Sequence, residues 1–356
     1  MKVENLGSGR PGGKIEKTYV WNRGRKKRAS EYEELTQFYS TPAVPFLPTQ
    51  KSHPAVSPLP WHYTATRIGP PDLDRSRLQY EAWELFVDPD EIHYSNYVAT
   101  QWDKERHVNE AQRDAELLQV DPTSTWVEFL RRFLPPLRYS KWSRVTALQY
   151  VIRFVPSSTV DAAVAFQAFD ELRAVQRIIR RSIQLHDRFG GFDDYRTNWL
   201  DGPEWQPARE YAERLNILRD WGEIIIACNL CLEPLIEPLV EEVGRLAATN
   251  GDLATSTMVS SLLTDELRHR RWTDAFVRML VDSEEFGESN REVIGEWLSV
   301  WYPRAVALIR GIGPLIDGIG GSGRYAAFED DLLGKQYPAL LDRVGLVSVL
   351  DSVRVQ

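Results

Sequence analysis

The sequence has very few cysteines and no long hydrophobic run. Its 356 residues include only two cysteines, Cys228 and Cys231, so a disulfide framework is excluded and a reducing cytoplasm is the expected compartment. No stretch of about 18 or more consecutive apolar residues occurs, which predicts no membrane-spanning helix. Met1 is followed by polar and glycine-rich sequence, which predicts that there is no signal peptide.

Positive charge is scarce as well. The chain has 43 Lys and Arg against 51 Asp and Glu, a formal net charge of −8, and this balance argues against a general nucleic-acid-binding protein. One basic run, RGRKKR at residues 23–28, has the composition of a nucleic-acid or targeting patch. Within an acidic chain we favour a solvated or partner-facing arm.

Runs of alternating β-branched residues, the mark of strands, are also absent. Between residue 76 and the end, long segments with few glycines predict helices of about 20 residues or more. We expect the helix that starts near residue 123 to break at Pro135 and Pro136. We expect Gly190 to end the next helix. Residues 207–248 should form one helical run. The sequence therefore predicts an all-α domain over residues 76–356 with additional C-terminal helices.

Residues 1–75 differ from the rest in composition. Prolines recur throughout the second half of this segment, which excludes long helices and central strands. Aromatic residues such as Tyr19, Trp21 and Phe38 are frequent, whereas disordered linkers contain few of them. We predict an extended, proline-rich N-terminal arm that lies on another surface, with one short helix starting at Ser30.

The two cysteines form a C-x-x-C pair, which is the spacing of redox motifs. Such motifs stand at the start of a helix in a βαβ context. Here the pair lies inside EIIIACNLCLEPLI, residues 223–236, which is apolar and helical in pattern. We favour buried thiols, and the sequence does not assign them a role.

One four-residue word, DELR, occurs twice. It reads FDELRAVQR at residues 169–177 and TDELRHRRW at residues 264–272. In a helix, residues three apart share a face, so Glu266 and His269 would point at one spot. Two such Glu-x-x-His pairs, with one Glu from each of two further helices, bind two irons in some helix bundles.

The first copy of the word lacks the histidine, because Ala174 stands three residues after Glu171. Both glutamates lie on apolar stripes of their predicted helices, and a buried carboxylate needs a partner or a metal. Glu171, Glu266 and His269 could hold one metal ion loosely but could not hold two irons. The neighbouring Asp and Arg residues of each word would orient these groups.

Four segments together resemble the soluble di-iron monooxygenases, the bacterial multicomponent hydroxylases of alkanes, alkenes and aromatics. The likeness is to the small (beta) hydroxylase subunit, covers most of the chain, and implies a ferritin-like long-helix bundle. The segments are KKRASEYEELTQFY (26–39), WELFVDPDEIHYSNYVATQWDKE (83–105), FQAFDELRAVQR (166–177) and NGDLATSTMVSSLLTDELRH (250–269).

In this family the large subunit binds the irons and the small subunit keeps the fold without the site. The resemblance places Leu232 at the position of the third helix's glutamate and Lys141 near that of the first. It therefore implies no catalytic, cofactor-binding or metal-binding residue in this chain, and a buried polar network in which the remaining groups pair with Arg173, Arg268 or Lys141. The vestigial site positions are Glu171, Ala174, Leu232, Glu266 and His269.

The resemblance implies a non-catalytic small subunit that scaffolds an iron-bearing large (alpha) subunit. The complex would hydroxylate a hydrocarbon with O2 and with electrons from NADH through a reductase. Expected partners are the large subunit, a second copy of the heterodimer, a regulatory protein and the reductase, and a small gamma subunit is left open. Propane, another small alkane or a cyclic ether is the favoured substrate, with phenol and toluene as the alternative.

Two other readings stay open from the residues alone. A stand-alone ferritin-like iron oxidase would use Glu171, Glu266 and His269 as ligands, although Ala174 and Leu232 argue against it. A helical adaptor without an enzyme partner would need none of them. Iron content and association with a large subunit would distinguish these readings from the favoured one.

Overall fold

The structure, a computed structural model, describes Tyr32 and residues 76–81, 83–117, 121–155, 157–193, 195–321 and 323–349. Every regular element in these ranges is a helix, which confirms the predicted all-α class. None of the described helices is long and apolar enough to span a membrane. Apart from Tyr32, the predicted arm at residues 1–75 and its helix from Ser30 lie outside the described residues.

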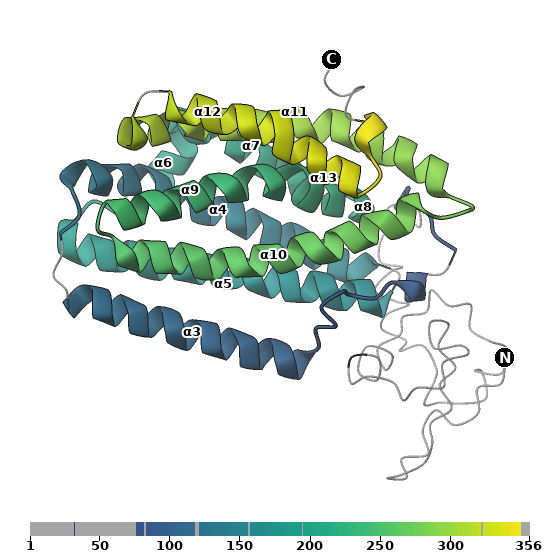
Figure 1. The fold of residues 1–356 in the computed structure, drawn as a ribbon, viewed down its shortest axis with the longest axis horizontal. Helices are drawn as coiled ribbons and strands as arrows, with labels where there is room; N and C mark the ends of the chain where they lie inside the picture. Colours follow the sequence, from purple (N-terminus) through teal and green to yellow (C-terminus); the bar gives the residue numbers. More distant parts are fainter. Residues whose placement is uncertain are drawn as a thin grey trace, which may run out of the picture.

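Four long helices form the centre of the molecule (Figure 1). They are α4 (Ser124–Phe154), α5 (Ser158–Phe189), α9 (Glu233–Thr249) and α10 (Leu253–Val281). α4 packs along α5, α9 packs along α10, and α10 also contacts α5. This arrangement is the long-helix bundle that the resemblance implied.

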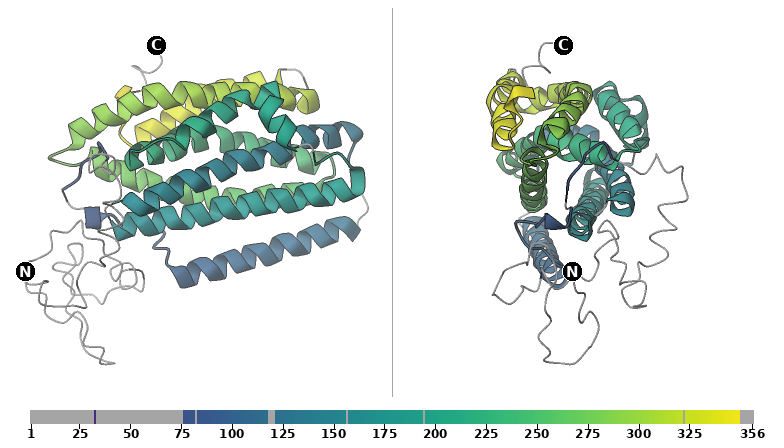
Figure 2. Two further views of the ribbon diagram at one scale, coloured as in Figure 1. Left: turned by 180° about the vertical axis from the view of Figure 1, so that it is seen from behind. Right: turned by 90° about the vertical axis from the view of Figure 1, so that its right-hand side faces the viewer.

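The remaining helices cover this centre on two sides. α3 (Tyr94–Leu117) packs on α10 at one side, and α11 (Gly287–Gly320) contacts α9 on the other (Figures 1 and 2). The shorter elements are η4 (Trp83–Leu85), α6 (Tyr195–Asp201), η5 (Pro203–Trp205), α7 (Gln206–Leu215), α8 (Trp221–Ile225), η6 (Ile226–Leu232), α12 (Arg324–Asp331), η7 (Leu332–Gln336) and α13 (Tyr337–Arg343).

Polar residues begin the long helices as capping chemistry predicts. Thr123, Ser157 and Asp252 each accept a hydrogen bond from a backbone N–H in the first turn of α4, α5 and α10, which satisfies donors that have no partner inside the helix. Gly190 ends α5 as predicted, with a φ of 69° that glycine adopts without strain.

The predicted break at Pro135 and Pro136 is wrong, because α4 continues through both residues. Proline has no N–H, so the carbonyls of Arg131 and Arg132 lose their helical partners. Neighbouring elements supply the missing donors: Asn198 Nδ2 lies 3.3 Å from the Arg131 oxygen, and Trp205 Nε1 lies 2.8 Å from the Arg132 oxygen. Tertiary contacts thus offset the local cost of the two prolines.

The helical run predicted over residues 207–248 is interrupted. α7 ends at Leu215 and α8 begins at Trp221, with Asp220 accepting hydrogen bonds from the first backbone N–H groups of α8. η6, which follows α8, is a π-helix. Its wider turn holds one residue more than an α-helical turn. After it, a given face of the helix is therefore occupied by the residue that follows the one an α-helical count predicts.

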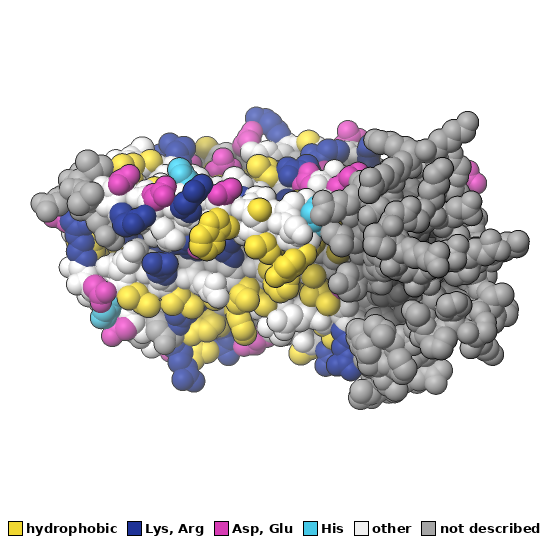
Figure 3. Space-filling model, turned by 90° about the horizontal axis from the view of Figure 1, so that it is seen from below, with side chains coloured by type: hydrophobic (Ala, Val, Ile, Leu, Met, Phe, Trp, Pro, Cys, Tyr) yellow, Lys and Arg dark blue, Asp and Glu magenta, His cyan; other side chains and the backbone are white. Residues whose placement is uncertain are grey.

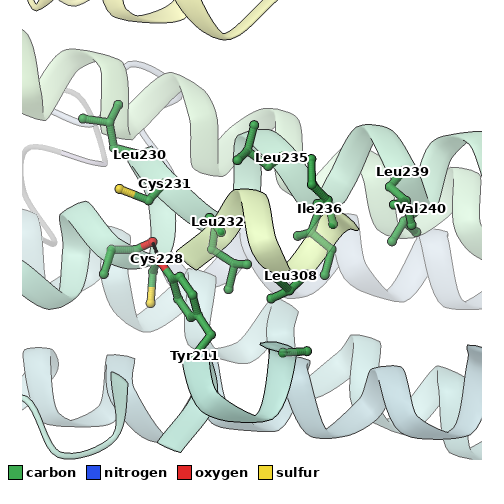
Figure 4. Close-up of a cluster of buried hydrophobic side chains, with 14 of the residues drawn as sticks. Tyr211, Cys228, Leu230, Cys231, Leu232, Leu235, Ile236, Leu239, Val240 and Leu308 are labelled. Atoms are coloured by element: carbon green, nitrogen blue, oxygen red, sulfur yellow. Dashed lines mark hydrogen bonds between the residues drawn. The ribbon is translucent and has the colours of Figure 1, made fainter. Parts of the chain in front are cut away.

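Cys228 and Cys231 lie in this π-helix and are fully buried, as predicted. Figure 4 shows them with Leu232 and Tyr211 in an apolar cluster. Burial raises the pKa of both thiols far above the usual range. A thiol that stays protonated is a poor nucleophile and a poor metal ligand, so the pair serves packing.

Tyr32, the one described residue of the predicted arm, belongs to the core. It is 2% exposed, and its hydroxyl accepts a hydrogen bond of 3.1 Å from the Asp88 backbone N–H. We expect Tyr32→Ala to lower the free energy of unfolding by about 3–5 kcal/mol, the usual cost of removing a large buried aromatic ring. Tyr32→Phe, which removes only the hydroxyl group, should cost about 1 kcal/mol. Urea unfolding followed by circular dichroism measures both, and equal losses would contradict the burial of the ring.

Candidate functional site

Four side chains that could ligate a metal meet inside the central bundle. They are Glu171 from α5, Glu233 from the start of α9, and Glu266 and His269 from α10, with ligand atoms all within 4.8 Å of one another. Each is buried, with at most 6% of its surface exposed. Glu266 and His269 share a helical face, as their three-residue spacing predicted.

Helix α9 contributes Glu233, which the sequence did not lead us to predict as part of the site. Leu232, which the resemblance placed at this ligand position, is 1% exposed and lies among apolar side chains such as Leu235 and Leu308 (Figure 4). The π-helix ends at Leu232, so the register of its wider turn brings the next side chain into the cluster. A signal was present in the sequence, because Glu233 and Glu237 are four apart in an otherwise apolar stretch.

Helix α4, the remaining helix of the central four, contributes two cations to the cluster and no carboxylate. Lys141 Nζ of α4 lies 2.6 Å from Glu266 Oε1, 2.8 Å from Glu237 Oε1 and 3.5 Å from Glu171 Oε2. One turn later, Arg144 lies 3.0 Å from Glu171, 3.1 Å from Glu233 and 2.9 Å from Glu237. The predicted pairing of the cluster with Lys141 is therefore present in the structure.

His269 faces carboxylates on both sides of its ring. Nδ1 lies 3.0 Å from Glu233 and 3.2 Å from Glu266, and Nε2 lies 3.0 Å from Asp170. Burial alone would lower the pKa of His269, but these three carboxylates outweigh it and raise the pKa well above the usual range. His269 is therefore an imidazolium that donates two hydrogen bonds, and it offers no lone pair to a metal.

The two glutamates of the DELR words differ in charge state. Burial raises the pKa of Glu171 to about 8, and Arg144 and Lys141 only partly oppose this rise. Neither oxygen of Glu171 accepts a hydrogen bond from any described residue, so the approach of Arg144 is not aligned for one. Burial also acts to raise the pKa of Glu266, but Lys141 and His269 lower it well below the usual range.

The cluster as it stands does not fit a divalent metal ion. Each of its three carboxylates already lies within 3.5 Å of Lys141 or Arg144. Burial and Arg144 act to lower the pKa of Lys141, but Glu171, Glu237 and Glu266 raise it, so its ammonium stays charged. A metal would meet the positive charges of Lys141, Arg144 and His269 at contact distance, and buried charges of one sign repel strongly.

The two DELR words pair with each other across α5 and α10. Asp170 of the first word binds Arg268 of the second, and Asp265 of the second lies 2.7 Å from Arg173 of the first. Neither arginine contacts Glu171 or Glu266 in the part of the chain that the structure describes, so the pairing expected for Arg173 and Arg268 is wrong. This reciprocal pairing explains why both words carry Asp and Arg.

α3 closes the open side of these ion pairs. Tyr97 and Gln101 each donate a hydrogen bond of 2.7 Å to Asp170, and Lys104 donates one of 2.5 Å to Asp265. Charged and hydrogen-bonded groups therefore extend from the centre of the bundle to its surface at α3.

The chain is similar to subunits of known hydroxylases. A family profile described as Methane/Phenol/Alkene Hydroxylase matches residues 63–284. The small subunit of the hydroxylase component of propane 2-monooxygenase from Rhodococcus jostii (strain RHA1) is 27% identical, over 93% of this chain and 89% of that protein. The beta subunit of the hydroxylase component of the toluene-4-monooxygenase system from Ectopseudomonas mendocina is 28% identical, over 79% and 84%.

A solved structure confirms the fold. Phenol hydroxylase from Pseudomonas sp. OX1 contains a chain with a TM-score of 0.72 and 18% sequence identity, matched over 97% of this chain and 98% of that one. This agreement confirms the ferritin-like long-helix bundle. With the family profile it shows that the chain belongs to the Methane/Phenol/Alkene Hydroxylase family, as a small subunit of the hydroxylase component of a multicomponent monooxygenase.

Proposed function

We propose that this chain is the non-catalytic small subunit of a hydroxylase whose large subunit carries a di-iron centre. The observation that carries the proposal is the position of Lys141 and Arg144, whose positive charges compensate the buried acidic groups of the cluster. Glu171, Ala174, Leu232, Glu266 and His269 then hold no metal and serve the stability of the bundle. The chain's part in the reaction is to scaffold the large subunit, in the cytoplasm.

The reaction of the assembled enzyme is the NADH- and O2-dependent hydroxylation of a hydrocarbon. Several similar proteins are named as small subunits of propane 2-monooxygenase, which favours propane, another small alkane or a cyclic ether. Similar proteins of the toluene and phenol systems give the alternative. The further partners of this proposal are a second copy of the heterodimer, a regulatory protein and a reductase.

A stand-alone iron oxidase is the second candidate, because four potential ligands do lie within 4.8 Å of one another. The two proposals differ in iron content. We expect the chain expressed alone with added iron to contain only substoichiometric iron by elemental analysis, because Lys141 and Arg144 compensate the cluster. We expect the complex with the large subunit to contain iron and to hydroxylate propane. A full iron complement in the isolated chain would contradict the scaffold proposal and support the oxidase.

A further inference from the structure

A polar groove runs along α3 and α5 on the outer face of the molecule. It consists of two adjoining cavities of about 400 and 190 Å³ that share Asn109 and Arg113. We name it the α3–α5 groove. The larger cavity is lined by Asn109, Gln112, Arg113, Arg180 and Gln184, and the smaller by Trp102, Glu105, Arg106, Asn109 and Arg113.

The groove carries positive charge that its own walls do not balance. Arg113 and Arg180 are exposed, and among the described residues no carboxylate forms an ion pair with either. The only acid in the walls, Glu105, is already held by Arg173 at 2.8 Å and by Arg177. In a chain of net charge −8, a groove with two unpaired arginines is a local exception that suits an anionic ligand.

A buried hydrogen-bond donor points to the same kind of ligand. Gln112 is 3% exposed and lines the larger cavity, yet its Nε2 has no acceptor among the residues that the structure describes. Buried amides without a partner are rare in folded proteins, because the group has lost its hydrogen bonds to water. A carboxylate placed in the cavity would meet Arg113 and Arg180 together, and Gln112 would donate to it once its inaccessible amide group turns toward the cavity.

Apolar side chains continue the groove along α3. Tyr94, Val98 and Trp102 are spaced four apart, and they are 70%, 44% and 71% exposed. Trp102 also lines the smaller cavity, so the stripe and the groove are continuous. Figure 3 shows hydrophobic and basic side chains side by side on this face. Exposed aromatic residues beside arginines are typical of protein interfaces rather than of free surface.

We propose that the α3–α5 groove and the stripe Tyr94–Val98–Trp102 form a docking surface for the large subunit, which inserts an acidic segment into the groove. The inference rests on the proposed function, which makes the large subunit the obligate partner. A permanent interface needs an apolar area, which the stripe supplies. Complementary charge selects the partner and its orientation, and Arg113 and Arg180 supply the positive side.

The test measures binding of the full chain to the purified large subunit at low and high salt. In the double variant Arg113→Glu/Arg180→Glu, we expect the Kd at low salt to rise roughly tenfold or more, and the salt dependence of binding to diminish. Gln112→Met, which keeps the size of the side chain and removes the amide, should weaken binding in the same direction. Arg196→Glu is the matched control, because Arg196 is exposed on α6, which packs on α4 and α7.

The outcomes separate this inference from the proposed function. If the wild-type chain binds the large subunit and the double variant binds as tightly as the Arg196→Glu control, the groove is not the docking surface. If the wild-type chain does not bind the large subunit at all, the scaffold function fails and the inference fails with it. Circular dichroism of each variant confirms that the exposed substitutions leave the helices intact.

Discussion

Replacing Lys141 by alanine is expected to destabilise the chain strongly and to create a metal site. The substitution leaves Glu171, Glu237 and Glu266 without the ammonium that lies 2.6–3.5 Å from them. Breaking a buried pair by removing one partner costs about 3–5 kcal/mol, since the remaining charge stays buried. We expect the free energy of unfolding in urea to fall by this amount in the absence of metal.

The same substitution removes the cation nearest to the four potential ligands. Glu171, Glu233, Glu266 and His269 would then face one cation fewer, and Mn²⁺, which suits carboxylate ligands, would replace the proton of His269 while Arg144 keeps its contacts with Glu171 and Glu233. We expect Mn²⁺ at roughly 100 times its Kd to restore about 2–3 kcal/mol to Lys141→Ala. The wild-type chain should gain nothing, because Lys141 and Arg144 already compensate its carboxylates.

Two controls make this result specific. Lys141→Ala/His269→Gln lacks the imidazole and should lose the stabilisation by Mn²⁺. Lys104→Ala removes a partly exposed lysine that pairs with Asp265, so it should cost about 1 kcal/mol or less and gain no metal response. Equal stabilisation of the wild-type chain by Mn²⁺ would show that the resident cations do not exclude a metal.

Replacing His269 by alanine is expected to have the second large effect. The variant leaves Asp170, Glu233 and Glu266 facing one another without the imidazolium between them, at a cost of about 3–5 kcal/mol. Glu266→Leu should cost less. In this variant Lys141 still pairs with Glu237, and Glu171, which is protonated in the wild-type chain, can ionise and replace the lost negative charge. Turnover per iron in the assembled complex should stay unchanged in both variants, since these residues do not contact the irons of the proposed large-subunit site.

The pH dependence of stability identifies the charge of His269. The pKa of His269 is raised in the folded state, whereas in the unfolded chain it is about 6.5. Its contribution to stability is therefore complete below about pH 6.5 and is lost as pH rises toward the folded pKa, by up to about 1.4 kcal/mol per pH unit. Glu171, with a pKa of about 8 when folded, acts in the same direction between about pH 4.5 and 8.

The measurement is the free energy of unfolding between about pH 6 and 9 for wild type, His269→Gln and His107→Gln. His107 is exposed on α3 and serves as the matched control. We expect His269→Gln to show a shallower decline with pH than the other two proteins. Identical slopes in all three would mean that His269 is neutral when folded, and that its contacts with Asp170 and Glu233 are ordinary hydrogen bonds.

Local pattern was sufficient for the helical class and for the faces of single helices. The spacing of Glu266 and His269, the capping position of Gly190 and the apolar run around Cys228 depend on neighbours along the chain. These expectations agree with the structure because helical periodicity is a local property. Ala174 was likewise identified from the repeat of DELR alone, and the segments around both words were enough to suggest the family.

Tertiary contacts decided the rest. α4 continues through Pro135 and Pro136 because Asn198 and Trp205 supply donors that no local pattern shows. The π-helix moves the ligand position from Leu232 to Glu233, and a count of residues cannot detect that wider turn. The sequence by itself determined which charges the bundle contains. Only the tertiary structure decided that Lys141 and Arg144 of α4 compensate the acidic groups of α5, α9 and α10. The energy of a buried charge depends on what lies within a few ångströms in space.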